Sequence, residues 1–292
     1  MALLGKEEIM IQSEKAFDRW KEIWHYNAKI NAMHFRQEEN VVNTGNSKQV
    51  LIFSFGPSLQ KNINEVKEKG LQYDCDIICI DKALNTLLDN NIIPKYVVIS
   101  DAQVNFEQYG NIDKKYVPQI KLLAAITANC KWAKHWYNNG GQTYYYVNKD
   151  HLRSHRIFDK YLQGENAAWT IPASSNVGNA AYVLAVLPLG YREVYLFGYD
   201  YSYNLIGDYY GAQKDKPIDT NLKVDKHRFY NHYTVIDING DLTQVSHNMQ
   251  FSAKWLISYA QEMQKHGVNT VNCTGAGILK INAQGRIIKE AA

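Results

Sequence analysis

A polar loop, a helix of small residues and a buried strand with an acid beyond its end follow one another in the second half of the chain. The loop residues of interest are Ser174, Ser175, Asn176 and Gly178. The strand spans Val194 to Phe197, and Asp200 follows it. Hydroxyls and bare amides at a helix start suit a phosphate, and an acid at a strand's carboxyl end lies where open α/β sheets bind ligands. The segment predicts a nucleotide site, but an ordinary helix cap would also use serine and asparagine.

Three predicted strands that precede this segment in the sequence end at residues that could contribute to the same site. The residues at or after their ends are Gly56, Pro57 and Ser58, then Asp81, then Asp101. Because parallel strands end at one edge of their sheet, these residues are expected to form one rim. Asp101 is the residue of this rim that serves either proton transfer or metal binding.

Apolar strands and helices alternate along most of the chain. Strands are predicted over 50–55, 76–80, 96–101, 122–126, 143–147, 194–197 and 270–273, and helices begin near Ser58, Ala83, Cys130, Val177 and Met249. This alternation predicts an α/β, Rossmann-like fold with a doubly wound, mostly parallel sheet. Two alternating segments around Asn239 and Gly240 predict a small C-terminal β-hairpin.

Three segments of the chain depart from the alternation of strands and helices. Residues 1–46 are predicted to be a helical N-terminal extension, and residues 47–292 the nucleotide-binding transferase domain. The extension carries an apolar stripe of Phe17, Trp20, Trp24, Tyr26 and Ile30, which could pack on the sheet or hold a partner such as a second copy. Another polar segment, 150–166, is predicted to be helical, and the long irregular segment 199–233 is a predicted lid.

Composition narrows the class of protein. The chain has 292 residues and a formal net charge of +3, from 32 basic and 29 acidic residues. Because the basic residues form no single run, there is no nucleic-acid signature. The scattered cysteines are typical of core residues in a reducing compartment. Cys75 and Cys79 have a CxxxC spacing, but no second Cys/His pair of suitable spacing accompanies them to form a zinc site. No apolar run approaches the roughly 20 residues of a membrane span, so we expect a cytoplasmic protein.

Four segments, in order, resemble the family of the Maf flagellin glycosyltransferases and the archaeal-type 6-hydroxymethylpterin diphosphokinases. They are Gly56–Leu59, Pro94–Asp101, Ser175–Asp200 and Asn272–Gly277. The first and third are also similar to bacterial sialyltransferases that use CMP-sialic acid. The resemblance implies a Rossmann-like transferase with a nucleotide-linked small-molecule donor.

The sialyltransferase resemblance also implies roles for single residues. It implies His247 as the general base on the acceptor, a role that suits the pKa of histidine. It implies Tyr203 and Tyr209 as groups that assist the donor phosphate. Phe55 stands where those enzymes usually carry an asparagine that contacts the nucleotide, which leaves the nucleotide open.

Two reactions and one non-catalytic role remain. Glycosyl transfer is favoured; it would need no cofactor and would use His247 and Asp101. Pyrophosphoryl transfer from ATP would need Mg²⁺, with Asp101 and Asp200 as its ligands. In both, the nucleotide would be bound by Gly56, Pro57, Ser58, Asp81, Ser174, Ser175, Asn176, Gly178 and Asp200. The third role is a non-catalytic nucleotide-binding or assembly module, and for both reactions the acceptor stays open.

Overall fold

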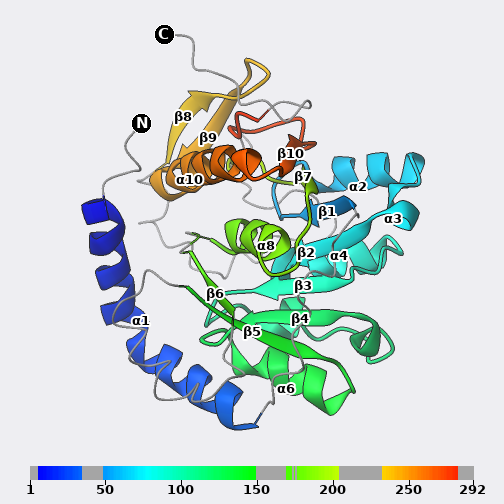
Figure 1. The fold of residues 1–292 in the computed structure, drawn as a ribbon, viewed down its shortest axis with the longest axis vertical. Coiled ribbons are helices and arrows are strands. Elements are labelled where there is room, and N and C mark those ends of the chain that lie inside the picture. Colours follow the sequence, from blue (N-terminus) through cyan, green and yellow to red (C-terminus); the bar gives the residue numbers. More distant parts are fainter. Residues whose placement is uncertain are drawn as a thin grey trace, which may run out of the picture.

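A parallel sheet runs through the computed structural model, which describes residues 6–34, 49–148, 169–172, 174, 176–203 and 232–281. The strand order is β10-β7-β1-β2-β3-β4-β5-β6 (Figure 1). The strands are β1 (Gln49–Phe53), β2 (Asp76–Ile80), β3 (Tyr96–Ile99), β4 (Lys121–Ala125), β5 (Thr143–Asn148), β6 (Trp169–Ile171), β7 (Glu193–Phe197) and β10 (Asn269–Asn272). The predicted doubly wound α/β fold is confirmed.

Helices connect the strands and cover the sheet. They are α1 (Lys6–His34), α2 (Leu59–Glu68), α3 (Leu71–Asp74), α4 (Leu84–Asp89), α5 (Phe106–Tyr109), α6 (Cys130–Asn138), α8 (Val177–Val186) and α10 (His247–Lys265), with short 3-10 turns η1 (Asp81–Ala83) and η2 (Val117–Gln119). Right-handed crossovers put α2, α4 and α6 on one face and α8 and α10 on the other. In agreement, α6 packs on β4 and β5, whereas α8 packs on β1, β2 and β3.

The centre of the sheet is apolar on both faces. In β1, the residues from Val50 to Phe53 are all buried, as expected for a parallel strand covered by helices on both sides. Every residue of α8 from Gly178 to Val186 is buried. Its alanines and glycine let this helix lie close to the strands. Because α8 follows β6 in the chain, its first turn lies at the carboxyl edge of the sheet.

The direction of winding reverses between β1 and β7. From β1 the chain proceeds outward through β2 to β6, and it then returns through α8 to β7 on the other side of β1. The two strands pair in parallel register from Gln49 with Glu193 to Phe53 with Phe197. Open α/β sheets bind ligands at such a reversal, beyond the carboxyl ends of the strands.

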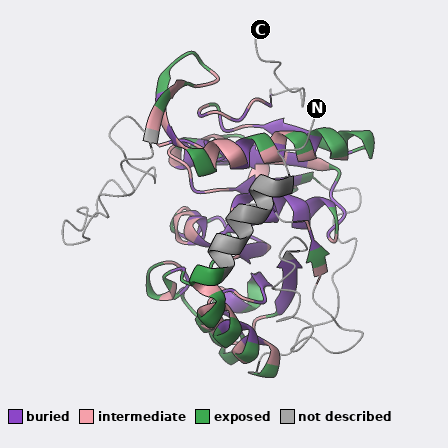
Figure 2. Cartoon of the chain, turned by 90° about the vertical axis from the view of Figure 1, so that its left-hand side faces the viewer, coloured by how far each residue is buried: buried purple, intermediate pink, exposed green. Residues whose placement is uncertain are grey.

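The N-terminal extension contains one long helix, α1, which lies beside the sheet. Figure 1 shows it along the side at which β3 and β4 end, and Figure 2 views the molecule from that side, with α1 in front. Ala28 of α1 is fully buried in the core. The predicted stripe is wrong in one residue, because Tyr26 is 61% exposed. At 100° per residue, Tyr26 lies well away from the face that carries Trp24 and Ala28.

The predicted hairpin is confirmed as antiparallel β8 (His232–Ile236) and β9 (Leu242–Ser246). Tyr203 pairs with Gln244 of β9, so the chain beyond β7 extends the hairpin by one residue pair. The boundary proposed at residues 46 and 47, the predicted helix over 150–166 and most of the predicted lid lie outside the described residues. Strand β6 and the short helices α3 and α5 were not predicted.

Candidate functional site

The turn after β1 presses against the chain after β7. The Gly56 amide donates to the Gly198 carbonyl at 3.0 Å. A Cβ on Gly56 would lie 1.9 Å from Oδ2 of Asp200 and 2.6 Å from the Gly198 oxygen. Only glycine fits there, because any side chain would overlap both groups. The two segments are therefore packed together at the point where the sheet reverses.

The Asp200 side chain hydrogen-bonds to this turn. Its carboxylate, in a residue that is 1% exposed, accepts hydrogen bonds from the Ser58 hydroxyl at 2.8 Å and the Ser58 amide at 3.4 Å. Burial raises the pKa of Asp200 to about 6, although the bonds from Ser58 oppose the shift. The Asp200 carbonyl accepts from the Ile278 amide, and Gly277 packs so closely on it that a Cβ there would lie 2.0 Å from that oxygen.

Asn62, on α2, joins three segments that sequence reasoning did not connect. Its Oδ1 accepts from the Gly198 amide at 2.8 Å, and its Nδ2 donates to the Thr274 carbonyl at 3.1 Å. Thr274 in turn accepts from the Tyr199 amide through its hydroxyl at 3.0 Å. These bonds connect the three segments that follow β1, β7 and β10, next to the Gly56 turn. An asparagine within a helix gave no signal of this role.

The start of α8 reaches the same place. Asn176 caps the helix, and its Oδ1 accepts from the Asn179 amide at 2.8 Å. A Cβ on Gly178 would lie 3.3 Å from both the Ser54 hydroxyl and the Tyr199 ring. Ser174 is buried just before the cap, and Ser175 lies outside the described residues. The predicted loop and the turn after β1 therefore meet at the carboxyl edge.

Two acids follow the neighbouring strands β2 and β3. Asp81 is 2% exposed and accepts from the Lys82 amide at 2.7 Å. Burial raises the pKa of Asp81 to about 6; Lys82 opposes this rise, and the nearby Asp101 adds to it. Asp101 is exposed, and its Oδ1 accepts from the Gln103 amide at 2.8 Å. The Lys82 ammonium lies 5.9 Å from the centre of the Tyr109 ring.

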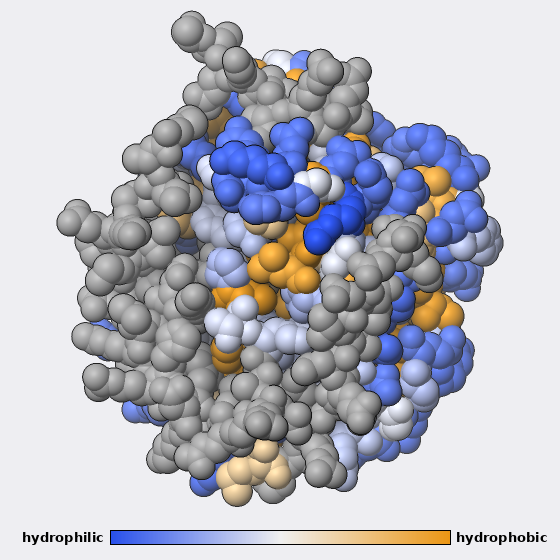
Figure 3. All heavy atoms as spheres, viewed as in Figure 1, coloured by the Kyte–Doolittle hydropathy of each residue, from blue (hydrophilic) through white to orange (hydrophobic). Residues whose placement is uncertain are grey.

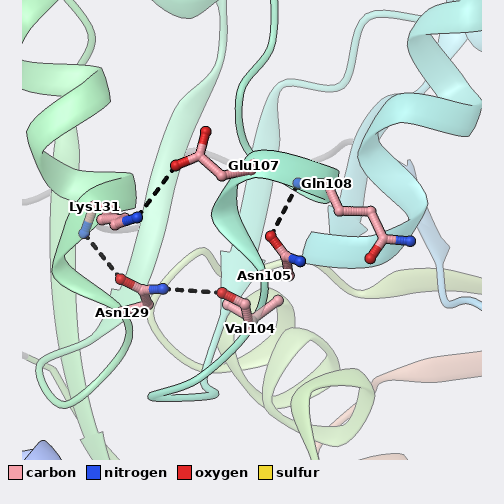
Figure 4. Close-up of polar contacts among 6 residues, drawn as sticks. All are labelled: Val104, Asn105, Glu107, Gln108, Asn129 and Lys131. Atoms are coloured by element: carbon pink, nitrogen blue, oxygen red, sulfur yellow. Dashed lines mark hydrogen bonds and ion pairs between the residues drawn. The ribbon is translucent and has the colours of Figure 1, made fainter. Parts of the chain in front are cut away.

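The loop after β3 is held by the start of α6 (Figure 4). The Asn129 side chain donates to the Val104 carbonyl at 3.0 Å, and its backbone amide donates to the Asp101 carbonyl at 3.2 Å. Asn105 caps α5 by accepting from the Gln108 amide at 3.1 Å. These bonds hold the backbone from Asp101 to Gln108, while the Asp101 carboxylate stays exposed.

The described residues implied by the sialyltransferase resemblance lie on elements other than the Gly56 turn, the start of α8 and the loops after β2 and β3. His247 is exposed in the first turn of α10, and its ring lies 5.0 Å from that of Tyr233. Tyr203 lies at the hairpin, where its carbonyl accepts from the Thr243 hydroxyl at 2.8 Å. Tyr209 lies outside the described residues. Phe55 is buried with its ring edge toward Tyr109, at 6.4 Å between centres.

The carboxylates at the rim are hard oxygen ligands of the kind that Mg²⁺ takes together with phosphate oxygens. Across the described ranges, no group of three or more His, Cys, Asp and Glu side chains could hold a metal ion. The four cysteines are unpaired thiols. A cation here would depend on Asp81, Asp101 and a phosphorylated substrate together.

Within the described residues, none of the helices combines the length and the apolarity needed to cross a bilayer. The described part of the face in Figure 3 is mostly hydrophilic, with small hydrophobic areas near its centre and right-hand side.

Comparisons with known proteins agree with this architecture. The family model described as "6-hydroxymethylpterin diphosphokinase MptE-like" matches residues 25–205. The 6-hydroxymethyl-7,8-dihydropterin pyrophosphokinase of Methanocaldococcus jannaschii is 34% identical over 93 residues, which cover 25% of this chain and 38% of that protein. The structure of the Maf glycosyltransferase from Magnetospirillum magneticum AMB-1 matches with a TM-score of 0.58 and 19% identity, over 88% of this chain and 37% of that chain.

These matches confirm the resemblance to the family of the Maf flagellin glycosyltransferases and the archaeal-type 6-hydroxymethylpterin diphosphokinases. The chain spans less than two fifths of the length of either relative, and the likeness to the Maf structure concerns the fold. The family match covers the last third of α1, the Gly56 turn, both rim acids and Asp200. The chain belongs to the 6-hydroxymethylpterin diphosphokinase MptE-like family.

Proposed function

We propose that this chain is a transferase that binds the phosphates of a nucleotide donor between β1 and β7 and moves a sugar from that donor to an acceptor. The Gly56 turn carries the proposal. It lies where the sheet reverses, it packs so closely on the chain after β7 that only glycine fits, and α2 begins directly after it. Backbone amides at such a helix start favour an anion.

Asp101 is the group that would act at the reacting end of the donor. Its carboxylate is exposed at the rim, and its backbone is held by Asn129. An exposed carboxylate can take the proton of an acceptor hydroxyl as the sugar is transferred. Lys82 lies beside the neighbouring acid Asp81 and would offset negative charge on the departing phosphate. His247 and Tyr203 stay proposals for the same steps, on the hairpin side.

Pyrophosphoryl transfer from ATP is the second candidate, favoured by the name of the 34% identical relative. In that reaction Asp81 and Asp101 would hold Mg²⁺, which neutralises charge on the transferred group. Asp200 fits a metal less well than the sequence suggested, because its carboxylate is buried against Ser58. It fits better as the support of the phosphate turn.

Thermal-shift binding tests both candidates. The purified chain is heated with CMP, CDP, UDP, GDP, ADP or ATP, each with and without Mg²⁺, because a ligand that binds only the folded state raises the unfolding midpoint. A shift with CMP, CDP, UDP or GDP, followed by turnover of the matching nucleotide sugar, supports glycosyl transfer. A Mg²⁺-dependent shift with ATP, and release of AMP, supports pyrophosphoryl transfer. No shift with any nucleotide contradicts both and favours the assembly module.

A further inference from the structure

Two asparagines on the buried face of α1 bond to loops at the carboxyl edge of the sheet. Asn27 and Asn31 are 3% and 1% exposed. The Asn31 side chain donates to the carbonyls of Ile126 at 2.8 Å and Ala128 at 3.1 Å, both in the loop after β4. Burying an amide is costly unless it is hydrogen-bonded. These bonds therefore help to determine where α1 sits on the domain.

Asn27 differs from Asn31 in what it connects. Its side chain donates to the Ala102 carbonyl at 3.2 Å and to the Thr127 carbonyl at 3.1 Å. Ala102 lies in the loop after β3, directly after Asp101, whereas Thr127 lies in the loop after β4. One amide group from the N-terminal helix thus bridges the two loops, 75 and 100 residues away in the sequence.

The loop that carries Asp101 is held from two directions. Asn129 bonds the carbonyls of Asp101 and Val104, and Asn27 bonds the carbonyl of Ala102 between them. The Gln103 amide is turned back onto the Asp101 carboxylate. The backbone is therefore fixed at several consecutive residues, while the Asp101 side chain stays exposed at the rim.

We propose that Asn27 is a positioning residue for Asp101, and that α1 is part of the scaffold of the transfer site. The amide keeps the loops after β3 and β4 in register, and so sets the direction of the Asp101 carboxylate. The catalytic consequence rests on the role given to Asp101 in the proposed function. The effect of Asn27 on the structure of the loop does not depend on that role.

The experiment compares Asn27→Ala with Asn31→Ala in the full chain. Both variants remove an amide that makes two bonds from the same face of α1, but only the first reaches the loop after β3. Hydrogen exchange is followed by mass spectrometry in peptides that cover residues 100–106, with stability measured by urea unfolding. We expect exchange at Gln103 to accelerate about tenfold in Asn27→Ala and to change less than about twofold in Asn31→Ala, for a similar loss of stability. Equal exchange in the two variants overturns the proposal.

A second variant and a second readout cover the remaining outcomes. If Asn27→Ala does not fold, Asn27→Leu keeps the volume of the side chain and removes its two donors, and its exchange decides the question in the same way. Donor turnover is expected to fall in the Asn27 variant in proportion to the loss of loop protection, and to change less than about twofold in Asn31→Ala. If Asp101→Asn retains full turnover, the proposed role of Asp101 is wrong, whereas the exchange result still decides whether Asn27 positions the loop.

Discussion

The Ser58 hydroxyl lies 2.8 Å from the Asp200 carboxylate, across the point at which the sheet reverses its winding. The two residues are 142 positions apart and belong to the segments after β1 and β7. Ser58 occupies the N-cap position of α2, but its side chain makes no cap bond there. Its hydroxyl instead anchors the turn that precedes the helix, so the shape of the Gly56 turn depends on a buried acid.

Replacing Gly56 by alanine should distort that turn. The new Cβ would meet Oδ2 of Asp200 at 1.9 Å and the Gly198 backbone oxygen at 2.6 Å, and overpacking of this kind costs about 1 to 3 kcal/mol. Urea unfolding should show that loss, and thermal shift should show no nucleotide binding. Gln60→Ala, in the first turn of α2, serves as the control. Normal nucleotide binding by Gly56→Ala would contradict the assignment of this turn.

Replacing Asp101 by asparagine should slow transfer about 100-fold, because a group that moves a proton contributes on that order. Asparagine keeps an oxygen for the Gln103 amide, so the loop should keep its shape. Asp113→Asn is the matched control: Asp113 is also exposed, and it accepts from the Lys115 amide at 3.0 Å in the same kind of turn. Its loop leads into β4, at the opposite edge of the sheet. Equal rates in the two variants would rule out a catalytic role for Asp101.

The burial of Asp200 predicts a pH-dependent stability. Its pKa rises from 3.8 to about 6 on folding, so the folded state binds the proton more tightly than the unfolded state. The stabilisation by this proton is complete below pH 4 and is lost as the pH rises through 6. Relative to Asp200→Asn, the wild type should therefore lose up to about 3 kcal/mol between pH 4 and pH 7. Urea unfolding of both proteins across this range measures the difference, and parallel curves would contradict it.

The position of Ala28 predicts how α1 responds to a charge. Ala28→Glu places a carboxylate in the core, which should cost about 3 kcal/mol or more or detach α1 from the sheet. Tyr26→Glu on the exposed face should leave stability within about 0.5 kcal/mol of the wild type. Urea unfolding and size-exclusion chromatography report both effects. If Tyr26→Glu instead changes the oligomeric state, the exposed face of α1 is an interface between copies.

Much of the fold was predictable because its signals are local. Apolar runs such as 76–80 show a buried strand directly, and the glycine and proline after the first strand show where it stops. Since parallel strands end at one edge, the placement of Asp81 and Asp101 on a common rim followed without the structure. Strand β6 was missed because three residues are too few to show a period.

The sequence by itself determined the type of fold and the residues at the ends of its strands, because strand and helix patterns depend on neighbours along the chain. Only the tertiary structure decided which of those residues face one another. Ser58 supports the turn through Asp200, and Asn27 reaches the loop of Asp101. Both contacts depend on the strand order and on the docking of α1, and they join residues 75 or more positions apart. Because such bonds depend on packing and not on local spacing, no pattern in the sequence predicts them.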